Sequence, residues 1–145
     1  MSWQERSGSC GLSALARRTQ RVATPDEALA RLRDYIGVSP SECGRHEQSR
    51  ADAGAVMASA QCVIEAAQMR RQSWMLVHER GVDSWMATGV LSGSDGVVRR
   101  FFYDSKPPTG KSVPMVVIVP CAAPKILAKT SGSYAGFDCT PEAIR

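Results

Sequence analysis

The sequence is notable first for what it lacks. It contains no asparagine, and therefore no N-glycosylation acceptor and no catalytic asparagine. No apolar run approaches the roughly 18 residues that a membrane span requires, and the longest one, 115–119, has the length of a strand. Residues 1–20 lack the apolar segment of a signal peptide, and whether one precedes residue 1 stays open. We therefore expect no membrane span.

Motifs for cofactors and metals are also missing. Gly110-Lys111-Ser112 matches the end of a P-loop, but Ser105 stands where that motif requires glycine, and the segment leads into a predicted strand. Cys43, His46 and Glu47 lie close together in sequence, yet a structural zinc site needs a fourth ligand from elsewhere. We expect neither a cofactor nor a bound metal.

The five cysteines have no C-x-x-C spacing, so a zinc-ribbon or thioredoxin-like motif is excluded. Cys43 and Cys62 lie 19 residues apart, and Cys121 and Cys139 lie 18 apart. These spacings favour two sequence-local disulfides with Cys10 left over, although four cysteines allow three pairings. Disulfides persist in oxidising compartments, which favours a periplasmic or secreted protein. The alternative is a cytoplasmic protein with five reduced thiols.

Charge is distributed unevenly along the chain. Residues 1–23 carry four arginines against Glu5, residues 24–104 are slightly acidic, and residues 105–145 are basic again. Basic ends are more typical of solvated tails than of a nucleic-acid interface, where charge gathers on one element. We therefore predict a flexible basic segment over 1–23 and one α+β domain over 24–145, and we do not expect nucleic acid as the partner.

Two helices are predicted in the first half of the chain. Thr24-Pro25-Asp26-Glu27 has the pattern of a capping box with proline at the first helical position, and Gly37 suits the end, which predicts a helix over 24–36. A connecting loop from residue 39 then contains Cys43. A second helix over 49–71 is apolar on two sides. We expect it to be central, with the sheet on one side and the first helix on the other.

Strands are predicted after residue 71. The segments 73–79, 83–91, 97–103 and 115–119 have strand character, and Asp-Gly in the loop 92–96 favours a hairpin. The predicted fold class is α+β, with two N-terminal helices followed by a four-stranded antiparallel meander packed on the longer helix. A further short strand is possible at 126–129. This order of elements resembles cystatin-like and nuclear-transport-factor-like architectures, but no motif supports a family.

One set of residues would suit a cysteine-dependent hydrolase. Cys43 or Cys62 would attack, His78 would serve as the base, and Asp83 or Asp104 would orient it. A chain with five cysteines and fourteen acidic residues offers such a set by chance, so a structural role is favoured. The two aspartates are expected near each other, away from the 92–96 loop, either as paired carboxylates or as turns that end the strands.

A second set of residues would suit a binding surface. Alternate residues of a strand face opposite sides, so the aromatic run 101–103 must divide between the two faces of the sheet. One face fills the core, and the other can expose an aromatic strip beside arginines, which suits protein binding. The candidate binding residues are Trp74, Trp85, Arg99, Arg100 and Phe102.

The sequence thus favours a non-enzymatic, disulfide-stapled binding module that acts outside the cytoplasm. Its partner is expected to be another protein, which it binds or inhibits. Two alternatives stay open. One is the cysteine-dependent hydrolase, and the other is a nucleic-acid-binding domain that uses arginines 70, 71, 99 and 100. Oligomeric state is not indicated.

Overall fold

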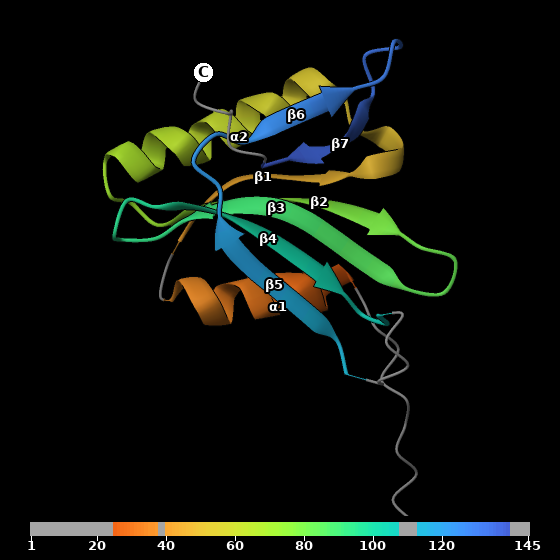
Figure 1. The fold of residues 1–145 in the computed structure, drawn as a ribbon, viewed down its shortest axis with the longest axis horizontal. Coiled ribbons are helices and arrows are strands. Elements are labelled where there is room, and N and C mark those ends of the chain that lie inside the picture. Colours follow the sequence, from red (N-terminus) through yellow and green to blue (C-terminus); the bar gives the residue numbers. More distant parts are fainter. Residues whose placement is uncertain (1–24, 38–39, 108–112, 140–145) are drawn as a thin grey trace, which may run out of the picture.

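The computed structural model describes residues 25–37, 40–107 and 113–139, so the predicted flexible segment 1–23 and Cys10 lie outside the described residues. A five-stranded sheet is the central layer, with α1 on one face and α2 with a two-stranded sheet on the other (Figure 1). The elements are α1 (Pro25–Ile36), β1 (Ser41–Glu47), a 3₁₀ turn (Gln48–Arg50), α2 (Ala53–Gln68), β2 (Ser73–Arg80), β3 (Trp85–Ser92), β4 (Val98–Asp104), β5 (Met115–Pro120), β6 (Lys125–Ala128) and β7 (Tyr134–Asp138).

The main sheet has the strand order β1-β2-β3-β4-β5. The pairs β2–β3, β3–β4 and β4–β5 are antiparallel, which confirms the predicted four-stranded meander. The predicted hairpin loop is also confirmed: Gly96 has a φ of 76°, and its N–H donates to the carbonyl oxygen of Gly93 at 3.1 Å. The sheet as a whole is mixed rather than antiparallel, because β1 pairs in parallel with β2.

Strand β1 corrects the prediction of a loop around Cys43. Its sequence, Ser-Glu-Cys-Gly-Arg-His-Glu, has neither an apolar run nor a regular alternation, so the usual strand signal is missing. Pairing with β2 supplies its backbone hydrogen bonds, and the register shifts between Glu42 and Gly44. Tertiary contacts therefore decide the conformation of this segment, not local preference.

Helix α1 forms over 25–36, as predicted, while the proposed cap Thr24 lies outside the described residues. Gly37 follows with a φ of 93°, and its N–H donates to the carbonyl oxygen of Arg33 at 3.1 Å, which is how glycine commonly ends a helix. The Tyr103 hydroxyl of β4 donates to Glu27 Oε2 at 2.9 Å. This bond, together with the buried apolar side of the helix, fixes α1 on the sheet.

Helix α2 begins at Ala53 and ends at Gln68, inside the predicted limits of 49 and 71. Asp52 is the cap, because its side chain accepts a hydrogen bond from the N–H of Ala55 at 3.0 Å. The prediction that α1 would cover this helix is wrong, since the two helices lie on opposite faces of the sheet (Figure 1). The second side of α2 contacts β6 and β7 instead.

The sheet accepts a helix on each face because β2 is buried on both sides. Trp74 and Leu76 pack with α1, and Met75 and Val77 pack with α2. A strand apolar at consecutive positions is typical of a central strand covered on both faces. The α2 side also includes Tyr134, so the small sheet contributes to the second core. No helix in the described ranges is both long and apolar enough to cross a membrane.

The short strand predicted at 126–129 is present as β6, and its antiparallel partner β7 was not predicted. In the turn of this hairpin, the carbonyl oxygen of Gly132 accepts a hydrogen bond from the N–H of Ala53 at 2.9 Å. The turn between β6 and β7 therefore lies at the start of α2. This contact fixes the C-terminal part of the described chain over the helix.

Candidate functional site

The cysteines form the two pairs that the spacing favoured. Cys43 Sγ lies 2.02 Å from Cys62 Sγ, and Cys121 Sγ lies 2.03 Å from Cys139 Sγ. The first pair joins β1 to α2, and the second joins the residue after β5 to the residue after β7. With both sulfurs bonded, neither Cys43 nor Cys62 offers a thiolate.

The residues of the predicted hydrolase are not brought together. His78 belongs to the series of β2 residues that faces α1, whereas the Cys43–Cys62 bond lies on the α2 side. Arg45 Nε donates to His78 Nε2 at 3.1 Å. Burial first, and then the charge of Arg45, lower the pKa of His78 from 6.5. No cysteine–histidine pair is therefore formed by this set.

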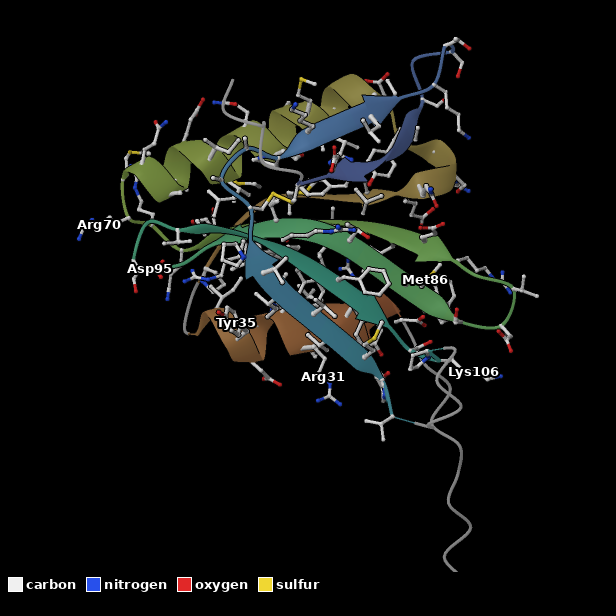
Figure 2. All side chains as sticks on the ribbon, viewed as in Figure 1. Arg31, Tyr35, Arg70, Met86, Asp95 and Lys106 are labelled. Carbon is white, nitrogen blue, oxygen red and sulfur yellow. A yellow bond between two sulfur atoms is a disulfide. The ribbon has the colours of Figure 1, made fainter. Side chains whose placement is uncertain are left out.

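Asp83 and Asp104 lie at the end of the sheet opposite the 92–96 loop, as expected, and both contact Lys106. Lys106 Nζ lies 2.6 Å from Asp83 Oδ2, and the Lys106 N–H donates to Asp104 Oδ1 at 2.9 Å. Figure 2 shows Lys106 at the end of the molecule opposite Asp95. The Asp104 side chain accepts from the N–H two residues later in the chain, which is the pattern of an Asx turn. This favours the role of a turn that ends the strand over that of paired carboxylates.

The residues considered for a metal site have other partners. Cys43 is bonded to Cys62, and His46 Nε2 lies 2.8 Å from Ser59 Oγ of α2. Within the described part of the chain, no group of three or more His, Cys, Asp or Glu side chains is arranged to hold a metal ion.

A cleft of about 810 Å³ lies beside the C-terminal end of β1. Its lining includes Arg45, His78, Arg80 and Trp85. The Arg45 guanidinium is already held by Asp26, at 2.7 Å, as well as by His78, and the Arg80 guanidinium lies 5.6 Å from the centre of the Trp85 ring. Arg45 thus has hydrogen-bonding partners within the protein.

The predicted binding residues divide between the two faces of the sheet. Trp74 is 1% exposed in the α1 core, so its inclusion in a binding surface is wrong. Trp85 lies under Arg80, and Arg99 pairs with Asp95 at 2.6 Å. Arginines 99 and 100 are consecutive in β4 and so face opposite sides, which means that these two do not belong to one basic patch.

Arg100 and Phe102 do share a face, and they lie in a groove. Phe102 pairs with Val117 of β5, and Arg100 pairs with Val119. These four side chains line a depression of about 260 Å³, which we call the β4–β5 groove. It opens on the same side of the sheet as α2. Phe102 is thus the aromatic residue that the alternation argument placed opposite Phe101.

Strand β5 is the outer strand at this edge of the sheet, with β4 as its neighbour on the inner side. Residues 113–120 contain no charged side chain. Val116, Val117 and Val119 are 39%, 39% and 41% exposed, which is unusual for valine in a strand. Edge strands normally carry charges, bulges or a covering element, because their unpaired backbone groups pair readily with other chains.

Arg100 supplies the one strongly polar group of the groove. Its Nε is buried and has no hydrogen-bond partner among the residues that the structure describes. The ion pairs found within those residues do not include Arg100, and its guanidinium lies 5.9 Å from the centre of the Phe137 ring. A buried donor without an acceptor is rare in native proteins and calls for an explanation.

No protein-family model matches this chain, and comparisons with curated proteins and with solved structures found no match. The site is therefore defined by its geometry alone. Sequence reasoning identified 115–119 only as a strand and did not indicate that Val117 and Val119 line a groove. The absence of charge throughout 113–120 is the signal that would have indicated an open edge.

Proposed function

We propose that this protein is a non-enzymatic binding module that receives an extended segment of another protein along the outer edge of β5. The observation that carries the proposal is the uncharged edge strand with its exposed valines beside the β4–β5 groove. In strand addition, backbone hydrogen bonds supply affinity and alternate side chains supply specificity. The β5 edge provides for both.

The side chains of β5 support this mode of binding on each face. Val116 lies on the α1 side, and Val117 and Val119 lie on the α2 side. An added strand would place its own alternate side chains beside these valines, at cross-strand distances of about 5 Å. Burial of the valines removes apolar surface from water at about 25 cal/mol per Å², which favours association.

Another protein fits this edge better than a second copy of the chain. Two copies that paired through β5 would bring together segments 113–120 that contain no acidic residue. Such pairing would leave the buried Nε of Arg100 without a carboxylate. A foreign segment is free to supply the missing group.

An oxidising compartment is part of the proposal. Cys43–Cys62 and Cys121–Cys139 both lie at bonding distance, and disulfides of this kind persist in the periplasm or outside the cell. Intact mass after alkylation, with and without reductant, tests this part on natively purified protein. Four cysteines blocked until reduction are expected, and immediate alkylation of all five would place the protein in a reducing compartment.

The binding mode is tested by selecting a displayed library of random peptides on the full chain and measuring the affinity of the isolates for variants. Val117→Lys puts a charge on the edge, and we expect at least about tenfold weaker binding because the lysine must be desolvated at an apolar contact. Val82→Lys is the matched control, since Val82 lies fully exposed in the β2–β3 connection. Equal affinities for the two variants would contradict the proposal.

The occupant is tested separately by light scattering of the purified chain. We expect a monomer for the wild type and for Val117→Lys. A dimer that Val117→Lys converts to a monomer would show that the edge binds a second copy, and the proposal of a foreign partner would then be wrong.

A further inference from the structure

We infer that the segment bound at β5 carries an aspartate or glutamate whose carboxylate is bound by Arg100 in the β4–β5 groove. This inference rests on the proposed function, because it specifies the chemistry of the partner at the same edge. It goes beyond strand addition as such, which requires only a backbone and apolar side chains.

The first argument is the unsatisfied state of Arg100. Its buried Nε has no acceptor within the described residues, and the rest of the groove consists of Phe102, Val117 and Val119, which have no side-chain acceptor to offer. An unmade bond to a buried donor costs about 1–3 kcal/mol, and more for a charged group. A ligand that supplies the acceptor recovers this cost, whereas an apolar ligand does not.

The second argument is the choice of acceptor. A guanidinium presents a planar fork of N–H donors that matches the two oxygens of a carboxylate, and such bonds are stronger than those between neutral groups. Among the residues that the structure describes, no carboxylate forms an ion pair with Arg100. On the same face of β4, Asp104 lies at the far end of the strand and accepts the N–H of Lys106.

The third argument is position. Val119 of β5 lies directly opposite Arg100 of β4. A strand added outside β5 would lie two strand spacings from β4, about 9.6 Å. A glutamate or aspartate on that strand, facing the α2 side, would extend over Val119 toward Arg100. The apolar wall of the groove would exclude water from the contact and strengthen it.

The test begins with the peptides selected on the full chain. We expect acidic residues to be enriched at one position among peptides with alternating apolar residues. Replacing that residue by its amide, Glu→Gln or Asp→Asn, should weaken binding to the unmodified protein about tenfold, because a charge-assisted bond to a buried donor is lost. This comparison changes only the peptide, so it does not depend on how a protein variant folds.

The position of the carboxylate is then tested with two arginine variants. Arg99→Gln is the matched control, since Arg99 is the neighbouring residue on the opposite face and pairs with Asp95. The acidic peptide and its amide should still differ about tenfold for Arg99→Gln, and they should bind equally to Arg100→Gln. A difference that persists in Arg100→Gln would show that another group binds the carboxylate, and the inference would be overturned.

The outcomes separate this inference from the proposed function. Peptides whose binding is weakened by Val117→Lys but not by loss of the carboxylate would leave strand addition intact and overturn the role of Arg100. Peptides that are insensitive to Val117→Lys would overturn both.

Discussion

The two edges of the main sheet are built in opposite ways. Strand β1 is polar, has a register shift between Glu42 and Gly44, and is bonded to α2 through Cys43. Strand β5 has no charged side chain, exposes three valines and is paired on its inner side by β4. Charges, bulges and covering elements are the usual means of preventing pairing at an edge. In the described part of the chain, β1 has charged side chains and a register shift, and β5 has neither.

This difference supports the proposal that β5 is the edge that accepts a partner. Two side chains of β1 already have partners within the protein: Arg45 pairs with Asp26, and His46 contacts Ser59. At β5 the valines are exposed, and the buried donor of Arg100 lacks an acceptor among the described residues. We propose that the uncharged edge is kept for binding, because folding of the described chain does not require exposed valines there.

The largest expected effect concerns the covalent bond that holds β1. Cys43→Ala combined with Cys62→Ala should lower the free energy of unfolding by about 3 kcal/mol, because the unfolded chain loses a cross-link that closes a loop of 19 residues. Urea denaturation measures the loss. Amide exchange should become faster in β1 while β5 changes little.

The matched comparison is the double variant Cys121→Ala with Cys139→Ala. It opens a loop of 18 residues beside β5, at the other edge of the sheet. Its cost in stability should be similar, but exchange should become faster near the end of β5 and not in β1. Uniformly faster exchange in both variants would show that the two edges are not stabilised independently.

A smaller effect is expected from Gly44→Ala. A Cβ at this position would collide with Ser59 Oγ and lie 2.8 Å from Ser59 Cβ, so β1 and α2 must move apart. We expect a loss of about 2 kcal/mol, as for overpacking elsewhere. The control is Gly136→Ala in β7, where the nearest atom would be Leu127 Cδ1 at 3.8 Å. Thermal unfolding of the two variants measures the difference, and equal stabilities would contradict the close packing of β1.

The smallest effect concerns pH and the β1 edge. Burial, followed by the charge of Arg45, lowers the pKa of His78 from 6.5, and Asp26 and Glu47 oppose this change. The unfolded chain then binds this proton more readily than the folded one. The contribution of His78 to the free energy of unfolding is therefore fully present above pH 6.5, and it falls as the pH drops toward the lower pKa of the folded protein. His78→Gln should reduce this fall, measured by unfolding at several pH values. An unchanged pH dependence would show that His78 is not its source.

Part of this fold could be predicted from the sequence because its signals are local. The strands of the meander follow from β-rich segments between turn residues, and Asp95-Gly96 indicated the hairpin between β3 and β4. The cysteine spacing likewise favoured the two pairs that the structure brings together. Element type and order could thus be predicted where pattern and turn chemistry agree.

The rest depends on tertiary contacts that no local pattern reports. Strand β1 is polar, and its conformation is set by β2 and by Cys62 on another element. The helices lie on opposite faces because β2 is apolar on both sides, a feature that is equally consistent with other arrangements. The candidate site was only half predicted: Arg100 and Phe102, both among the predicted binding residues, line the β4–β5 groove, but Trp74 lies in the core.

The most direct test of the central claim is amide hydrogen exchange of the full chain with and without a selected peptide. We expect exchange in β5 to slow when the peptide binds, because an added strand bonds the backbone groups of the outer edge, while exchange in β1 stays unchanged. Slower exchange in β1 or around the cleft lined by Arg45 and His78, with β5 unaffected, would contradict the assignment of β5 as the binding edge.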